Sequence, residues 1–504
     1  MPGGLAVRRS GRLLGLVAAL AGLGCAGPPA EPPPGESAWA RAGREAVARA
    51  RGPEPPGGAR NAILFVGDGM GLSTVTAARI LEGQQRGETG EENLLAFERL
   101  PHVALLKTYN TDQQTPDSAG SMTALVTGEK TRAGVLGLDA AAARGDHAGA
   151  AGHALRTLLE EAEERGLATG IVTTTSVTHA TPAATYAHVP ERDWESDAQL
   201  PEAARRDGFP DIARQLLETP WGDGPEVVLG GGRSAFLPAG RPDPEDPGSA
   251  GERLDGRDLV AEWLARPGSA YAWNRAGLAA IDPGAVGRVL GLFGPSHMHF
   301  EVDRLGDRGG EPSLAEMTAF ALRRLERSPR GFFLMVEGGR IDHAHHGGNA
   351  YRALTETIEL SRAVEVALGA TDPADTLVVV TADHDHTLTL AGYATRGNPV
   401  LGLVVENDLR GEPAPESAPD SAGLPYTALG YQNGPGYVAP RPDLGRVDTA
   451  DPGYRQEASV PLASETHSAH DVPLYAGGPG AALFRGVQEQ SYVYHAIAAA
   501  LGWR

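Results

Sequence analysis

The sequence predicts an α/β protein in which helices flank a central sheet. From residue 61 onwards, short apolar runs of strand length alternate with stretches of helical periodicity, and no repeat of fixed period is visible. A chain of 504 residues with 41% hydrophobic residues can also bury a large core. The predicted strands are 62–69, 168–175, 225–232, 331–339 and 375–386.

Helices are predicted between these strands and after the last one. The first begins near Ser73, directly after the first predicted strand. Residues 392–460 interrupt the alternation because they are rich in glycine, proline and tyrosine, and we expect them to form a small inserted subdomain. The remaining predicted helices are 118–128, 153–165, 210–218, 313–327, 349–369 and 487–501.

The first 25 residues are typical of an export signal. Arg8, Arg9 and Arg12 precede the apolar stretch LLGLVAALAGLG, which is short for a membrane span, and Cys25 follows it. This order resembles a bacterial lipoprotein signal, in which the cysteine is lipidated and becomes the new N-terminus. Ordinary signal cleavage and a twin-arginine signal stay open, and each alternative predicts export to the periplasm or the outer surface. Residues 26–58 are expected to be a Pro/Gly-rich tether to a folded domain at 59–504.

Charge and cysteine content narrow the classes of function. A net charge of −20 argues against a nucleic-acid-binding surface, which needs a basic face, and against attraction to anionic lipid. The chain has one cysteine, so an intramolecular disulfide is excluded. An anionic substrate would therefore need local positive charge from arginine or from a metal ion.

Acidic and histidine side chains follow the predicted strands. Asp68, Glu337, Asp342, Asp383 and His384 lie at or just past the C-terminal ends of apolar runs. In open α/β sheets, ligands bind at that edge. Each residue alone is compatible with an ordinary turn or a capped strand end, but their shared position predicts one ligand site.

The stretch GGRIDHAHHGG, residues 338–348, contains a spacing that suits a metal ion. Asp342 and His346 are four positions apart, so a helical turn directs both side chains to one face, while His343 and His345 point elsewhere. Imidazole combined with carboxylate favours zinc over calcium or magnesium, which prefer oxygen ligands. A histidine-rich surface loop is the competing interpretation.

Further ligands are needed for a complete site, and the segment SETHSAHD offers two. His467 and His470 both lie there, more than a hundred residues after the histidine-rich stretch. Together with the aspartates at the strand ends, they are enough to complete a metal site.

A candidate nucleophile lies in TPDSAGSMTALVTG. Ser118 follows Asp117 at the start of a predicted helix, where free amides and the helix dipole favour a phosphate group. An ordinary helix N-cap, with Ser121 as a first-turn residue, would leave the same pattern. No G-x-S-x-G elbow surrounds Ser118, so activation by a metal fits better than activation by a triad histidine.

Several segments, taken in order, resemble alkaline phosphatases. They are VGDGMGLSTVTAARI, TPDSAGSMTALVTG, HATPAATYAHVPERDWESDA, FFLMVEGGRIDHAHHGGNAYRALTET, VTADHDH and SETHSAHDVPLYA. The similarity is closer to the animal enzymes than to the familiar periplasmic bacterial ones through RLDGRDLVAEWLA, GPGYV and GVQEQSYV. The resemblance implies a three-layer α/β/α fold with a mainly parallel sheet of about ten strands, a crown-like insertion and a homodimer.

The resemblance also implies a phosphate monoesterase with two zinc ions and one magnesium ion. Ser118 would form a phosphoserine, and Arg192 would hold two oxygens of the phosphoryl group. His343 would touch phosphate through water, and Asp117 and His179 would support the site without binding metal directly. The implied ligands are Asp342, His346 and His467 for the first zinc, Asp68, Asp383 and His384 for the second, and Asp68, Thr181 and Glu337 for magnesium.

Some departures from the family pattern leave alternatives open. An animal-type calcium site would align with Glu245, the Phe293 carbonyl and Glu311, but Gly294 stands where an acidic ligand is expected, so calcium is left open. A phosphodiesterase-leaning member of the same superfamily is one alternative function. A surface lipoprotein that binds phosphate or metal without turnover is the other.

Overall fold

Three fully buried apolar strands form the middle of the sheet. The computed structural model describes residues 37–50 and 58–503, so the predicted signal, Cys25 and part of the predicted tether lie outside the described residues. Continuous burial is expected of parallel strands that are covered on both faces. The middle strands are β1 (Asn61–Gly67), β7 (Phe332–Gly338) and β8 (Thr376–Ala382).

These three strands end at the same level. β1 pairs in parallel with both neighbours, and Gly67 lies beside Gly338 on one side and Ala382 on the other. The segments that follow the strands therefore begin at one edge of the sheet, which is where the sequence places its acidic and histidine residues.

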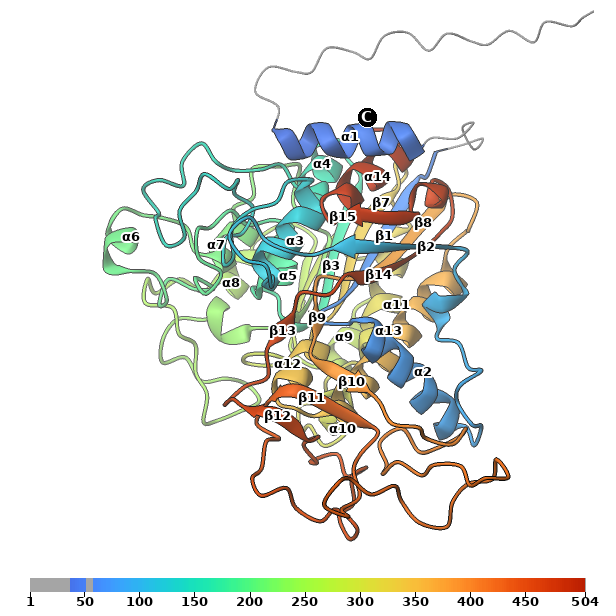
Figure 1. Ribbon diagram of the computed structural model, residues 1–504. Coiled ribbons are helices and arrows are strands. Elements are labelled where there is room, and N and C mark those ends of the chain that lie inside the picture. The colour runs from blue at the N-terminus through green and yellow to red at the C-terminus, as the bar shows by residue number, and fades with distance from the viewer. Residues whose placement is uncertain (1–36, 51–57, 504) are drawn as a thin grey trace, which may run out of the picture. The chain divides into compact units, whose positions relative to one another are not determined.

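Ten strands make up the whole sheet, in the order β15-β2-β14-β8-β1-β7-β3-β4-β6-β5 (Figure 1). Seven of its nine strand pairings are parallel, and only β14 runs against its two neighbours. The predicted large, mainly parallel sheet is therefore confirmed. Its outer strands are β2 (His102–Lys107), β3 (Ala168–Ser176), β4 (Val227–Gly231), β5 (Ser269–Ala272), β6 (Arg288–Leu292), β14 (Val472–Gly477) and β15 (Gly486–Glu489).

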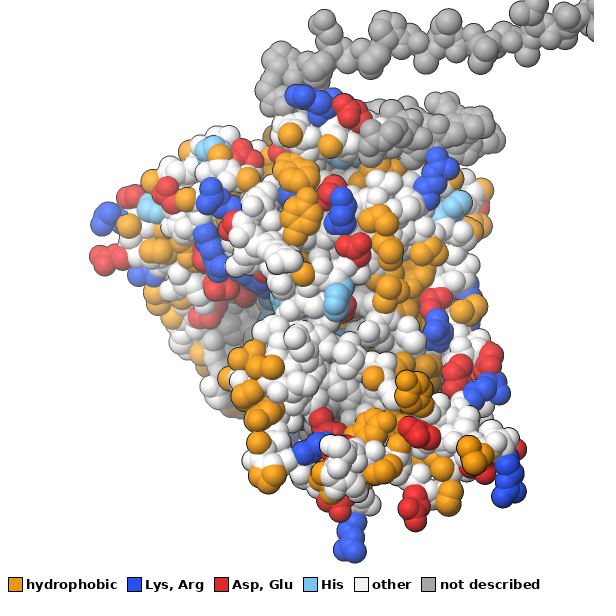
Figure 2. Space-filling model, in the orientation of Figure 1, with side chains coloured by type: hydrophobic (Ala, Val, Ile, Leu, Met, Phe, Trp, Pro, Cys, Tyr) orange, Lys and Arg blue, Asp and Glu red, His pale blue; other side chains and the backbone are white. Residues whose placement is uncertain are grey.

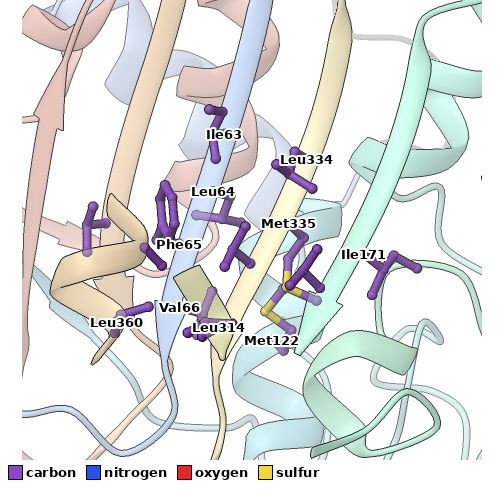
Figure 3. Packing of buried hydrophobic residues seen from close by; sticks show 14 of the residues in the cluster. Ile63, Leu64, Phe65, Val66, Met122, Ile171, Leu314, Leu334, Met335 and Leu360 are labelled. Carbon is purple, nitrogen blue, oxygen red and sulfur yellow. The ribbon is translucent and has the colours of Figure 1, made fainter. Parts of the chain in front are cut away.

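Helices cover both faces of the sheet and create the three layers. In Figure 1, α2, α11 and α13 lie on one side and α3, α4 and α5 on the other. Figure 3 shows Leu360 of α13 and Leu314 of α11 packed on the central strands, with Met122 of α3 beside Met335 of β7. The helices are α1 (Ala38–Ala50), α2 (Leu72–Gln85), α3 (Ser118–Thr127), α4 (Leu158–Glu164), α5 (Ala180–Ala183), α6 (Glu202–Arg206), α7 (Ile212–Leu217), α8 (Leu259–Leu264), α9 (Arg275–Ala280), α10 (Glu301–Arg304), α11 (Leu314–Leu325), α12 (Arg340–His346), α13 (Ala350–Ala370) and α14 (Tyr492–Ala500).

The segment expected to be an inserted subdomain is largely irregular. Val404, Ala418 and Ala428 form a small apolar cluster of their own in it. A three-stranded sheet in the order β10-β11-β12 joins this segment to the strand directly before it, since β11 lies within the segment and β12 at its end. The small strands in this part of the chain are β9 (Asp385–His386), β10 (Leu388–Leu390), β11 (Leu429–Gly434), β12 (Ala458–Pro461) and β13 (His467–Ser468).

Three element predictions were wrong in part. The strand predicted at 375–386 breaks after β8, because the Asp383 carboxylate accepts the amides of Gly69 and His384 and turns the backbone out of the sheet. The helix predicted at 487–501 begins only at Tyr492, because residues 486–489 pair with β2 as strand β15. The helix predicted at 153–165 begins only at Leu158, and Ala154 instead forms a bridge with Leu138. All three errors involve contacts with other segments of the chain.

The tether prediction was wrong over residues 38–50. This run is rich in alanine and free of proline, so it forms helix α1 between the proline-rich stretches on either side. α1 packs closely on the C-terminal helix, since a Cβ atom added at Gly43 would lie 2.0 Å from the ring of His495. In the described ranges, no helix combines the length and the apolarity needed to cross a membrane.

Candidate active site and metal centre

Helix α12 starts directly after β7 and carries part of a group that we name the histidine-rich cluster. It consists of Asp342, His346, His386 and His467. The Nε2 atoms of His346 and His467 lie 3.1 Å apart, and each lies 3.3 Å from the Oδ1 atom of Asp342. The structure thus brings together the three residues expected at the first zinc and adds His386, whose Nε2 lies 2.8 Å from the same carboxylate oxygen.

The outer nitrogens of two of these histidines are fixed by backbone carbonyls. His346 Nδ1 donates to the Glu465 carbonyl at 2.6 Å, and His467 Nδ1 donates to the Pro116 carbonyl at 2.8 Å. A neutral imidazole that donates from Nδ1 carries a lone pair on Nε2. Two such lone pairs and a carboxylate oxygen therefore face one another, which is the donor arrangement that a zinc ion satisfies.

Asp342 is more acidic in this environment than an isolated aspartate. Burial alone would raise its pKa, but the neighbouring His346 and a hydrogen bond from His386 hold the pKa well below its usual range. Burial would likewise lower the pKa of His386, but Glu465 and Asp342, one on each ring nitrogen, raise it to about 10. The cluster thus contains an ionised carboxylate before any metal binds.

A second group, which we name the acidic cluster, consists of Asp68, Glu337, Asp383 and His384. All four side chains are fully buried. His384 Nε2 lies 3.3 Å from Asp68 Oδ1 and 3.4 Å from Asp383 Oδ2. The two clusters adjoin, because the ring of His384 stacks on that of His467 with centroids 3.6 Å apart.

Burial, and to a smaller extent repulsion between carboxylates, raises the pKa values in the acidic cluster. Burial and the neighbouring Asp383 raise the pKa of Asp68 well above its ordinary value, and burial raises that of Glu337 to about 7. Burial also raises the pKa of Asp383. Several buried carboxyl groups at this spacing favour a bound cation, since a cation would stabilise their ionised forms.

The residues expected at magnesium lie on the far side of Asp68. Thr181 Oγ1 donates to Asp68 Oδ2 at 3.5 Å, and Glu337 Oε1 is buried without a hydrogen-bond partner among the described residues. The ligand atoms of Asp68, His179 and Glu337 lie within reach of one ion. His179 is therefore closer to this position than the sequence indicated, and the oxygen-rich donors fit magnesium.

Ser118 occupies the first position of α3, beside both zinc candidates. Asp117 caps the helix by accepting the Gly120 amide, so the free amides at the helix start surround the serine. Ser118 Oγ lies 3.2 Å from His384 Nε2 and 3.5 Å from Asp68 Oδ1. The hydroxyl is thus close to the metal ligands and next to a helix N-terminus.

Arg192 is held against the same helix start. Its Nη1 donates to Asp117 Oδ2 at 3.1 Å, and its Nη2 lies 3.1 Å from His179 Nε2. Burial would raise the pKa of Asp117, but Arg192 and the amides of Gly120 and Gly134 lower it. The ionised Asp117 therefore holds the guanidinium at the start of α3, and Arg192 supplies a fixed positive charge there in a negatively charged protein.

His343 lies next to two residues that sequence reasoning missed. Arg340 Nη1 donates to His343 Nδ1 at 2.8 Å, which leaves the proton of the neutral ring on Nε2. The ring of His297 lies 4.4 Å from that of His343 and 5.5 Å from that of His179. His297 follows β6 at the same edge of the sheet, and this strand-end position was the signal that could have identified it.

Two other histidines considered as candidates lie outside the clusters. His345 is fully buried and hydrogen-bonds Thr74 Oγ1 at 3.0 Å and the Tyr431 hydroxyl at 2.8 Å. His470 pairs with Asp385 at 2.9 Å, and 71% of its side chain is exposed. Among the described residues, neither His345 nor His470 hydrogen-bonds a member of either cluster, although the ring of His345 stacks on that of His386 with centroids 4.8 Å apart.

A hollow of about 540 Å³ opens beside the histidine-rich cluster. It is lined by residues 113–117, by His346 and by 464–467. Apolar surface dominates its wall, so it can accept the organic part of a substrate.

The residues considered for calcium are bonded within the protein. Glu245 accepts Arg233 Nη2 at 2.9 Å, and Glu311 accepts both the amide and the ring Nδ1 of His299. Gly294 stands where an acidic calcium ligand was expected, and it has no side-chain oxygen. Calcium takes six to eight oxygen ligands, and a donor set already paired with an arginine and a histidine does not fit it.

Comparisons with known proteins agree with this arrangement. Residues 59–503 match the family model for alkaline phosphatase. The tissue-nonspecific alkaline phosphatase of Gallus gallus is 48% identical over 87% of this chain and 84% of its own length, and an alkaline phosphatase of Gadus morhua is 45% identical over 87% and 91%.

Solved structures show the same fold. The alkaline phosphatase of Thermus thermophilus is 27% identical, covers 90% of this chain and 93% of its own, and superposes with a TM-score of 0.64. That of the Antarctic bacterium TAB5, at 22% identity, covers 89% and 100% with a TM-score of 0.60. The chain therefore belongs to the alkaline phosphatase family.

Proposed function

We propose that the chain hydrolyses phosphate monoesters through a phosphoserine formed at Ser118. As an alkaline phosphatase it is a metal-dependent phosphomonoesterase. The observation that carries the assignment of Ser118 is its position: the buried hydroxyl lies at the N-terminus of α3 and within 3.5 Å of side chains from the acidic cluster. A phosphate at this point would meet free helix amides and the charge of Arg192.

We propose the metal ligands in the same terms. Asp342, His346 and His467 would hold one zinc ion, and Asp68, Asp383 and His384 would hold a second. Asp68, Thr181 and Glu337 would hold magnesium, with His179 beside it. When bound, the metals would supply the positive charge that lowers the pKa of the serine hydroxyl and stabilises the departing alkoxide.

The protein's own residues have distinct parts in the proposed reaction. The helix amides and Arg192 bind the phosphoryl oxygens, and the planar guanidinium contacts two of them at once. Ser118 Oγ gives up its proton and attacks phosphorus in line with the leaving oxygen. The alcohol departs into the hollow beside His346, and a water then attacks the phosphoserine from the same side and releases inorganic phosphate.

A phosphodiesterase and a non-catalytic binding protein are less well supported. The relatives named above are all alkaline phosphatases, and Ser118 and Arg192 are both present beside the clusters. The roughly 540 Å³ hollow leaves room for varied leaving groups, so weak diesterase activity fits as a side reaction.

We further propose that the protein is exported, anchored through a lipid on Cys25, and dimeric. The sequence of the signal supports the first two points, and the family resemblance supports the third. Mass spectrometry of the mature N-terminus tests the anchor, since a diacylated cysteine and a free cleaved terminus differ by several hundred daltons.

The test of the nucleophile compares Ser118→Ala with Ser249→Ala, which lies in an exposed turn. With zinc and magnesium present at alkaline pH, we expect Ser118→Ala to lose at least about a thousandfold in turnover of p-nitrophenyl phosphate. Ser249→Ala should match the wild type. Intact-mass analysis after an acid quench should show one added phosphate on the wild type and none on Ser118→Ala, and equal turnover in both variants would refute the assignment.

A further inference from the structure

Glu465 is a buried acid beside the histidine-rich cluster to which the proposed mechanism gives no part. Only 1% of the residue is exposed, and it lies two positions before His467. Its Oε1 atom accepts the amide and the hydroxyl of Thr387, at 2.7 and 2.6 Å. Its Oε2 atom lies 2.5 Å from His386 Nδ1. Three donors therefore fix the carboxylate in a single orientation.

His386 connects this carboxylate to a proposed zinc ligand. Its other nitrogen, Nε2, lies 2.8 Å from Asp342 Oδ1. Each ring nitrogen thus faces a carboxylate oxygen, and the three side chains form a line from Glu465 through His386 to Asp342. The Asp342 oxygen in this line is also the one that lies 3.3 Å from His346 Nε2 and from His467 Nε2.

The backbone of Glu465 contacts a second proposed ligand. Its carbonyl accepts His346 Nδ1 at 2.6 Å, and its amide donates to the His346 carbonyl at 3.0 Å. One residue therefore orients Asp342 through its side chain and His346 through its backbone, and it precedes His467 on the same short segment.

We propose that Glu465 is the positioning residue of the histidine-rich cluster and that it acts on zinc through His386 and Asp342. The inference rests on the proposed function, because it presumes that zinc binds at this cluster. Partners of metal ligands orient those ligands before the metal arrives, and their loss typically weakens metal binding about 10- to 100-fold. The Glu465 carboxylate is bound by His386 and Thr387, so the proposed effect of this side chain passes through the metal site.

Mutation can separate the side-chain contact of Glu465 with His386 from its backbone contacts with His346. Glu465→Gln keeps the backbone bond to His346 and removes only the acceptor for His386. If the line of three side chains acts as one unit, His386→Gln should have a similar effect, and Glu465→Gln with His386→Gln together should be no worse than the stronger single change. Independent structural damage would instead make the two effects multiply.

The experiment follows zinc release from the metal-loaded, full-length protein into a chromophoric chelator. We expect Glu465→Gln to release the zinc bound at this cluster about 10- to 100-fold faster than the wild type, with an unchanged circular dichroism spectrum. Glu163→Gln, a buried acid on α4, and Glu416→Gln, an exposed acid, lie outside both clusters and are the controls, which should release zinc at the wild-type rate.

The outcomes separate this inference from the proposed function. If Glu465→Gln released zinc at the wild-type rate, the positioning role of Glu465 would be refuted, but the proposed zinc site would not be. A wild type that binds no zinc would overturn the proposed function, and this inference with it. If Glu465→Gln does not fold, His386→Gln tests the same line of contacts, and a wild-type release rate in that variant would equally refute it.

Discussion

The histidine-rich cluster and the acidic cluster adjoin, yet different interactions hold them. In the histidine-rich cluster, outside acceptors fix the rings: the carbonyls of Glu465 and Pro116 orient His346 and His467. In the acidic cluster, carboxylates are crowded together, and Glu337 Oε1 has no partner in the described part of the chain. The first cluster is therefore arranged before metal binds, whereas in the second a bound cation or protonation relieves the repulsion between carboxylates.

The pKa directions express the same difference. The pKa of Asp342 is held well below its ordinary value by its histidine neighbours, against the effect of burial. Burial and like charges raise the pKa of Asp68 and burial raises that of Glu337. Metal removal should thus destabilise the acidic cluster more than the histidine-rich cluster. Each of the following changes tests one of the two clusters.

The largest effect is expected at Asp68, which belongs to two of the candidate ligand groups. Asp68→Ala removes a ligand from the second zinc and from magnesium at once, so we expect turnover to fall at least about a thousandfold. Metal analysis of the purified variant should show about one zinc left and no magnesium. Full metal content in Asp68→Ala would contradict the shared position of this carboxylate.

The pH dependence of the metal-free protein tests the acidic cluster. The folded-state pKa of Glu337, about 7, is above that of an exposed glutamate, so the folded state holds this proton more tightly than the unfolded state. Its contribution is therefore complete below about pH 4.5 and is lost as pH rises through 7. In the presence of a chelator, the unfolding free energy of the wild type should therefore fall between about pH 4.5 and pH 7. We expect Glu337→Gln to abolish up to about 3 kcal/mol of this fall.

Urea unfolding of the wild type and of Glu337→Gln at several pH values measures this difference. Glu326→Gln, which changes an exposed acid outside both clusters, is a control that should keep most of the wild-type dependence of the unfolding free energy on pH. If the unfolding free energy changed equally with pH in the wild type and in Glu337→Gln, the raised pKa of Glu337 would not contribute to this pH dependence, and the prediction would be wrong.

In the histidine-rich cluster, we expect the opposite effect: neutralising a carboxylate should destabilise the metal-free protein. Asp342→Asn takes the negative charge from a buried group to which His386 donates, so it should lower the unfolding free energy of the metal-free protein by about 2 to 3 kcal/mol at pH 8. Asp383→Asn is the matched change in the acidic cluster, and it should cost less or stabilise the protein. If both changes destabilise it equally, the two clusters do not differ in the way described.

The central strands of the sheet could be predicted from the local pattern of apolar residues, but the strand at its edge could not. Runs such as 62–69 and 331–339 are apolar at nearly every position because both faces of a parallel sheet are covered. The segment 486–489 is half exposed and pairs only at the sheet edge, so its helical periodicity was misleading. Pairing with a distant strand decided its structure, and no local signal carries that information.

The candidate site shows the same limit. The four-residue spacing of Asp342 and His346 predicted a shared face, because helix geometry is local. His386 was missed although it lies two positions after His384, since its importance depends on contact with Glu465, 79 residues further along the chain. Supporting residues of this kind are defined by what they touch, and a single sequence does not show those contacts.

The smallest effect on activity is expected at His345, which shares α12 with His346 and stacks on His386 but hydrogen-bonds Thr74 and Tyr431 instead of a proposed ligand. His345→Gln loses bonds to Thr74 and Tyr431 in the core, so we expect a cost of about 1 to 2 kcal/mol in unfolding free energy. Because none of these partners is a candidate ligand, zinc content and turnover should stay within about twofold of the wild type. His346→Gln, one position away, should lose zinc, and the reverse outcome would exchange the roles of the two neighbours.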